Sequence, residues 1–211
     1  RFGLNVEIID GNREATLVYK GVREALDLGN TCSLILDIGG GSNEIILGNT
    51  SEPFWLHSFN LGVSRLMQQF QLSDPITQKQ LMVLEEFISV EVQTLFDAAR
   101  RFIPLQLVGS SGSFDSIRSI MEHSGSIAPG SEPWAEIPLE RYYELHNFFI
   151  TSTHDQRMTL KGLDPMRVDL IVPASVFINL IVRKLGINRL FQSSYALKEG
   201  FMAELQSSHA F

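Results

Sequence analysis

Two kinds of hydrophobic pattern alternate along the chain, and together they predict an α/β fold. Short apolar or alternating runs are typical of strands, and they occupy residues 6–9, 34–38, 45–47, 52–60, 105–109 and 190–193. Longer segments with apolar residues at helical spacing are typical of amphipathic helices, and they occupy residues 13–28, 77–102, 139–152 and 169–185, with a last helix from about residue 196. Asn12 is placed to cap the first of these helices, and Thr77 the second. Residues 124–138 show no periodicity and predict an exposed loop.

The most informative stretch is residues 33–48, which read SLILDIGGGSNEIILG. An apolar run, three glycines and a second apolar run predict a β-hairpin with a glycine loop at its tip. Asp37 then ends a buried strand, where a carboxylate is costly unless it is paired, hydrogen-bonded or bound to a cation. The glycines allow backbone N–H groups to converge on an anion beside it. The pattern fits a magnesium-bound phosphate, and it also fits a plain tight turn.

Spacing excludes three other motifs. A dinucleotide fingerprint requires a glycine where Glu44 stands and a helix after the loop. A Walker A loop requires a lysine beside the glycines, and this chain has none there. A hydrolase nucleophile elbow is excluded at residues 109–113, because Ser113 takes the place of its final glycine.

Residues 37–44, Asp-Ile-Gly-Gly-Gly-Ser-Asn-Glu, resemble the second phosphate motif of the exopolyphosphatase and guanosine pentaphosphate phosphohydrolase family, a branch of the actin-like ATPase superfamily in which threonine is usual at Asn43. The resemblance spans about residues 6–205. It implies a ribonuclease H-like α/β lobe with a mixed sheet, a strand meander and helical insertions at about 63–103 and 139–185. It also implies that residues 1–211 are the second lobe of a two-lobe catalytic module, with the first lobe expected ahead of Arg1.

Glu14 is the candidate catalytic base. From the residues alone it is an ordinary glutamate in the first turn of a helix, where the helix dipole favours a negative charge. The resemblance changes this interpretation, because residues 11–15 are similar to the family's Gly-x-Glu-Glu-Ala, whose second glutamate is taken as the base. Arg13 replaces the first glutamate of that pair.

The resemblance also implies a cofactor and a set of ligands. Asp37 and Glu44 are expected to hold Mg²⁺, directly or through its waters. Residues 109–113 resemble the family's second glycine loop, although by themselves they predict only a strand-to-helix turn. Arg65 is a candidate for a phosphate contact and equally for a surface ion pair. The expected phosphate-binding set is Gly39, Gly40, Gly41, Ser42, Arg65, Ser111, Gly112 and Ser113.

Composition limits the partners. The formal charge of −7 disfavours nucleic acid and anionic membranes. The longest apolar run, residues 170–182, is interrupted and too short to span a bilayer. The single cysteine, Cys32, excludes an internal disulfide and fits a reducing compartment, which favours the cytoplasm. The family resemblance adds the expectation of a homodimer.

The activity implied by the resemblance is hydrolysis of terminal phosphoanhydride bonds, which releases phosphate from inorganic polyphosphate or guanosine pentaphosphate. Two alternatives stay open. One is a phosphotransferase or sugar kinase of the same superfamily, in which the base lies in the other lobe. The other is a non-catalytic lobe that binds a phosphate polyanion.

Overall fold

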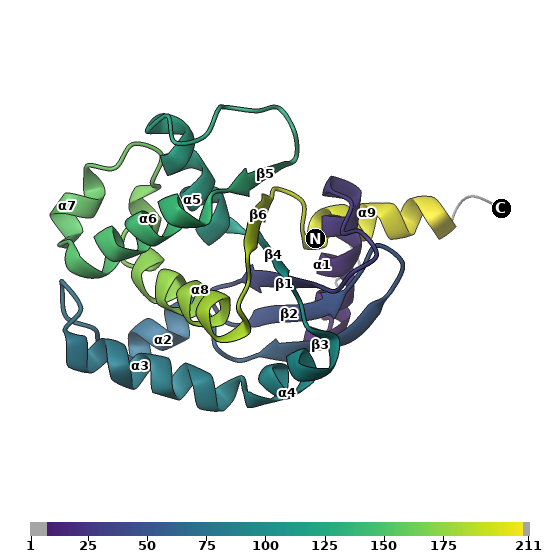
Figure 1. Ribbon diagram of the computed structural model, residues 1–211, viewed down its shortest axis with the longest axis horizontal. Coiled ribbons are helices and arrows are strands. Elements are labelled where there is room, and N and C mark those ends of the chain that lie inside the picture. Colours follow the sequence, from purple (N-terminus) through teal and green to yellow (C-terminus); the bar gives the residue numbers. More distant parts are fainter. Residues whose placement is uncertain (1–7, 209–211) are drawn as a thin grey trace, which may run out of the picture.

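The computed structural model describes residues 8–208, and it confirms the predicted α/β class. Within this range six strands form one mixed sheet in the order β3-β2-β1-β4-β6-β5 (Figure 1). The strands are β1 Ser33–Ile38, β2 Asn43–Gly48, β3 Pro53–Phe59, β4 Gln106–Ser110, β5 Trp134–Ile137 and β6 Arg189–Ser193. The helices are α1 Gly11–Ala25, α2 Val63–Phe70, α3 Gln78–Glu91, α4 Gln93–Phe102, α5 Gly112–His123, α6 Leu139–Thr151, α7 His154–Met158, α8 Ile171–Leu185 and α9 Leu197–Ser208, with a 3-10 turn at Pro165–Arg167.

The centre of the sheet is parallel and its margins are antiparallel. Strands β1, β4 and β6 run in the same direction. Strands β2 and β3 continue from β1 as the predicted meander, and β5 pairs antiparallel with β6. The carboxyl ends of the three parallel strands therefore lie at one edge of the sheet.

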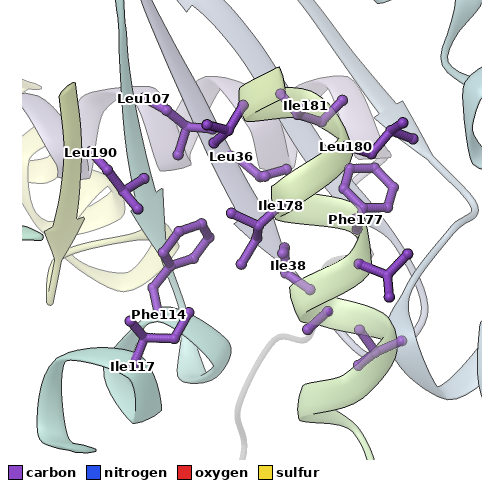
Figure 2. Close-up of a cluster of buried hydrophobic side chains, with 14 of the residues drawn as sticks. Leu36, Ile38, Leu107, Phe114, Ile117, Phe177, Ile178, Leu180, Ile181 and Leu190 are labelled. Atoms are coloured by element: carbon purple, nitrogen blue, oxygen red, sulfur yellow. The ribbon is translucent and has the colours of Figure 1, made fainter. Parts of the chain in front are cut away.

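Strand residues alternate between two hydrophobic layers because successive side chains point to opposite faces. Leu36 and Ile38 of β1 belong to the larger cluster, in which they pack with α8 and α5 (Figure 2). Ile35 of the same strand belongs to a smaller cluster with α1, together with Val108 of β4. Helices α1 and α9 lie side by side on this second face (Figure 1).

The first helix begins earlier than the sequence predicts. Asp10, and not Asn12, is its N-cap, because the Asp10 side chain accepts a hydrogen bond of 2.8 Å from the Arg13 N–H. Asn12 lies inside the first turn, where its carbonyl oxygen accepts from the Thr16 hydroxyl. The predicted cap was therefore wrong by two positions, and both residue types are good caps, so composition did not distinguish them.

The long helix predicted at 77–102 is two helices, α3 and α4, which meet at Val92. The predicted Thr77 cap is confirmed as a capping box with Gln80. Val92 has φ −95° and ψ 20°, outside the helical region, but it is fully buried like Ile88 and Leu95 on either side. The apolar stripe continues across the break, so hydrophobic periodicity did not reveal it.

Two short elements were missed. Strand β5 lies inside the segment predicted as a loop; it has four residues and pairs with one neighbour only, β6. Helix α7 has five residues, too few to show a helical period. Half of the strand predicted at residues 6–9 falls outside the described residues, and the other half, Ile8 and Ile9, is not in a strand. No helix in the described part of the chain is long and apolar enough to cross a membrane.

Candidate active site

Polar side chains meet where the parallel strands end, on the face covered by α1. In the strand register, Asp37 of β1 lies opposite Glu44 of β2 and opposite Ser110 of β4. Ser58 on β3 is in turn the partner of Glu44. Because paired residues on adjacent strands share a face, the strand register alone gathers two carboxylates and two hydroxyls at one point.

Asp37 is buried, with 5% of its surface exposed. The Ser110 hydroxyl donates to its Oδ2 atom at 3.0 Å, and the Ser111 hydroxyl to its Oδ1 atom at 2.5 Å. Burial raises the pKa of Asp37, and the hydrogen bonds from Ser111 and Ser110 offset part of that rise. The described residues provide Asp37 with hydroxyl donors and no ion-pair partner.

Glu44 is 2% exposed and accepts a hydrogen bond of 2.7 Å from the Ser58 hydroxyl. Burial raises its pKa to about 7, and the charges of Glu14 and Asp37 contribute to the rise, while hydrogen bonds from Ser58 and Ser42 oppose it. The carboxylates at this edge of the sheet therefore destabilise one another's charged forms, as expected where positive charge is lacking.

Glu14 reaches the same place from α1. The Asp10 cap fixes the start of the helix, and the Glu14 N–H closes its first turn onto the Asp10 carbonyl at 3.0 Å. Burial raises the pKa of Glu14, and the charge of Asp37 raises it further. A carboxylate with a raised pKa in a cleft is suited to accept a proton.

Hydrogen bonds from the start of α2 hold the glycine loop in place. The carbonyl groups of the loop accept them. The N–H groups of Val63 and Ser64 donate to the Gly39 and Gly40 carbonyls at 3.0 and 3.1 Å. Gly62 allows this approach, because a Cβ atom there would lie 2.3 Å from the Gly40 backbone. Among the described residues, the amides at 40–42 make no backbone hydrogen bond. They remain available to an anion.

The second loop joins β4 to α5. Ser111 is the N-cap of α5 but makes no side-chain cap hydrogen bond, since its hydroxyl donates to the Asp37 carboxylate instead. The Arg167 guanidinium covers Gly112, where a Cβ atom would lie 1.8 Å from the arginine Cζ. Helix N-termini bind anions through their free N–H groups, and this one has a cation beside it.

These parts surround a cleft of about 430 Å³. Of the residues predicted from the sequence, eight line it, namely Glu14, Asp37, Gly39, Gly40, Gly41, Ser42, Glu44 and Ser111. Three do not line it, namely Arg65, Gly112 and Ser113. Arg65 is exposed and its Nε atom lies 4.0 Å from the position of a Cβ atom on Gly41. The start of α9 closes the cleft with Ser194, Ala196, Leu197, Lys198 and Glu199.

The donor set fits magnesium. Mg²⁺ usually keeps several waters and binds one or two carboxylates, and Asp37 and Glu44 are buried carboxylates on paired positions. No group of three or more histidine, cysteine, aspartate or glutamate side chains within the described residues is arranged to hold a metal. Two carboxylates would leave the other positions around a magnesium ion to water and substrate.

A family model described as the Ppx/GppA phosphatase family matches residues 1–209. The chain belongs to this family. It is 26% identical to a putative exopolyphosphatase of Haemophilus influenzae over 207 residues, which cover 98% of this chain and 62% of that protein. It is 29% identical to a guanosine-5'-triphosphate,3'-diphosphate pyrophosphatase of Pseudoalteromonas atlantica, over 93% of this chain and 38% of that protein.

The Ppx/GppA fold is also found among solved structures. The crystal structure of an exopolyphosphatase from Cytophaga hutchinsonii superposes with a TM-score of 0.91 at 32% identity, and covers 97% of this chain and 66% of that one. The predicted actin-like ATPase fold is thus confirmed. The chain spans less than two thirds of the length of the curated relatives quoted above. Its division into one lobe with helical insertions stays a prediction.

Sequence reasoning missed several residues that shape this Ppx/GppA site. Ser58 and Ser110 were overlooked because a single serine in a strand carries no signal until the register is known. Arg167 was not singled out, because its place over Gly112 depends on the turn before α8. Lys198 was not singled out either, and it is the basic side chain that lines the cleft within the described residues.

Two departures from the family pattern have structural consequences. Arg13 turns toward α9, where its guanidinium donates to Glu204 at 2.9 Å, and it does not line the cleft. Asn43 is fully buried; its amide donates to the Leu61 carbonyl at 3.0 Å, but its Oδ1 atom has no partner among the described residues. A threonine in this position would not bury that additional acceptor.

Proposed function

We propose that this protein hydrolyses terminal phosphoanhydride bonds and releases phosphate from inorganic polyphosphate or guanosine pentaphosphate. The observation that carries the proposal is the meeting of Glu14, Asp37 and Glu44 in one cleft with the free amides of the glycine loop. A lone acidic cleft would repel a polyphosphate, whereas a cation on two of the carboxylates together with amide donors would hold it. The names of the curated relatives support the same substrate class.

In the proposed reaction a water oxygen forms a bond to the terminal phosphorus while the bond to the bridging oxygen breaks. Glu14 accepts the proton of the attacking water, a role that typically contributes about 10²–10⁴-fold. The amides at 40–42 and the N-terminus of α5 hold the phosphate oxygens. Lys198, which lines the cleft, and Arg167, which lies against Gly112, would add positive charge to this arrangement.

We assign Mg²⁺ to Asp37 and Glu44. When bound, the ion would neutralise charge on the phosphate oxygens. Ser110 and Ser111 fix the Asp37 carboxylate, and Ser58 fixes Glu44. The remaining proposals from the sequence, a cytoplasmic location and a homodimer, rest on the cysteine content and the family resemblance.

The first test measures magnesium-dependent phosphate release from polyphosphate and from guanosine pentaphosphate by the complete gene product. Asp37→Ala is expected to abolish release, while Asp97→Ala, an exposed aspartate of α4, leaves it unchanged. Intact turnover in Asp37→Ala would disprove the metal assignment. Phosphate transfer to an added acceptor instead of water would favour the phosphotransferase alternative, and binding without turnover would favour the non-catalytic one.

A second test addresses the loops. Gly40→Val and Gly112→Val are expected to raise the KM, because new side chains would contact Ser64 or displace Arg167 beside the phosphate. Gly130→Val is the control, since a Cβ atom there lies 3.8 Å from its nearest neighbour, Arg118, away from the cleft. An unchanged KM in both loop variants would show that these loops do not hold phosphate.

A further inference from the structure

Ser111 has a backbone conformation that is unusual for a residue with a side chain. Its φ is 68° and its ψ is 175°. This combination lies in a region that is occupied almost only by glycine, because a Cβ atom crowds the neighbouring peptide groups there. The next residue, Gly112, could adopt this conformation without strain, yet it is Ser111 that adopts it.

The Ser111 side chain has one use that a glycine could not fulfil. Its hydroxyl donates to Asp37 Oδ1 at 2.5 Å, the shorter of the two serine hydrogen bonds on that carboxylate. It does not cap α5, although it occupies the N-cap position, where serine usually makes a cap hydrogen bond. The strain and the absent cap are thus both associated with the contact to Asp37.

We propose that Ser111 is a positioning residue for Asp37, and that the protein retains a strained serine because its hydroxyl orients the carboxylate toward the cation. The part that concerns the cation rests on the proposed function. The part that concerns the backbone does not, because it depends only on the conformation of residue 111. Strained residues that a surrounding structure maintains are a recognised feature of functional sites.

Ser110 offers a matched control on the same carboxylate. Its hydroxyl donates to Asp37 Oδ2 at 3.0 Å, but it lies in strand β4 and is not among the residues with positive φ. Alanine and glycine at either position remove the hydroxyl, so the difference between them reports only the backbone. At residue 111 the Gly variant is expected to melt about 2–4 °C above the Ala variant. At residue 110 the order is expected to reverse, since glycine weakens a strand.

The second measurement is magnesium binding without substrate, by calorimetry on the complete gene product. Ser111→Gly and Ser111→Ala are both expected to weaken magnesium binding about tenfold, since groups that orient a metal ligand typically contribute 10–100-fold. Ser111→Thr, which keeps the hydroxyl on a backbone unfavourable for a β-branched residue, is expected to retain most of the affinity while it melts lower than the natural protein.

The outcomes separate the two proposals. If Ser111→Gly is no more stable than Ser111→Ala, or if magnesium binds both as tightly as it binds the natural protein, the role of Ser111 is disproved whatever the enzyme does. If the natural protein binds magnesium and responds to these variants but releases no phosphate, only the proposed function fails. If it binds no magnesium, both fail.

Discussion

The two faces of the sheet are built from alternating residues of the same strands, yet they differ in what they bury. The α8 face receives Leu36, Ile38 and Leu107, which continue into an extensive apolar layer (Figure 2). The α1 face receives Ile35 and Val108, and two positions further along β1 it receives a carboxylate, Asp37. Along β1 the α8 face stays apolar to the last residue, Ile38, whereas the α1 face changes from hydrocarbon to carboxylate within the strand.

Because of this difference, the α8 face contributes mainly to stability, and the end of the α1 face holds the candidate site. Apolar area removed from water stabilises the fold at roughly 25 cal/mol per Å², and most of it lies on the α8 face. Buried carboxylates reduce stability unless they are compensated, and among the described residues they lie where the smaller layer ends. We therefore expect substitutions on the α8 face to change stability alone, and substitutions at the end of the α1 face to change turnover and pH dependence.

The largest expected effect is on turnover. Glu14→Gln should lower kcat by about 10²–10⁴-fold without lowering the free energy of unfolding, because burial already disfavours the charged form of Glu14. Phosphate-release kinetics and urea unfolding measure the two quantities. Glu24→Gln, an exposed residue of the same helix, is the control. A kcat that is equal in both variants would remove Glu14 from the mechanism.

On the opposite face, Phe177→Ala should lower the free energy of unfolding by about 3–5 kcal/mol, because this ring of α8 is fully buried. Its kcat per folded molecule should stay unchanged. Phe201→Ala is the control, since that ring of α9 is 46% exposed and its loss should have little effect on stability. Reduced kcat in folded Phe177→Ala would show that the two faces are coupled.

The third prediction concerns pH in the metal-free protein. The folded-state pKa of Glu44 is about 7, above its ordinary value of 4.5, so folding favours its protonated form. Its contribution to stability is therefore complete below pH 4.5 and is lost as the pH rises through 7, a change of about 3 kcal/mol. Urea unfolding between pH 4 and pH 8 measures this change.

The Glu44→Gln variant is the comparison for that experiment. The variant should lack this part of the pH dependence and should be more stable than the natural protein at pH 8. An identical pH dependence in the two proteins would mean that Glu44 is not the group that titrates. Added magnesium should reduce the destabilisation at high pH in the natural protein only, because the ion favours the charged form.

The smallest expected effect is on the melting temperature, and it distinguishes the two candidate N-caps of α1, Asp10 and Asn12. Asp10→Ala should lower the melting temperature by about 2–4 °C, since it removes the hydrogen bond to the Arg13 N–H. Asn12→Ala should change it by less, because the Asn12 side chain does not cap the helix. The reverse order in thermal melts would restore the cap predicted from the sequence. Because α1 carries Glu14, the capped helix also positions the proposed base.

Some features of the site followed from local sequence alone. The hairpin with its glycine loop was predicted because apolar runs on both sides of three glycines allow few other structures. Helix α8 was predicted for a similar reason, since a long apolar segment at helical spacing dominates its neighbourhood. The break at Val92 was missed because it does not interrupt the hydrophobic period, and strand β5 was missed because four residues are too few to establish one.

The sequence by itself determined the strand with Asp37, the glycine loop and the family, and it indicated the groups that we propose to bind phosphate and metal. Only the tertiary structure decided that Ser58 and Ser110 hold the carboxylates, that Arg167 covers Gly112, and that Ser111 accepts a strained backbone to contact Asp37. Local propensity acts between residues near in sequence, whereas strand register and helix packing bring together residues dozens of positions apart. The chemistry of each residue can be inferred from the sequence, but its partners are set by the fold.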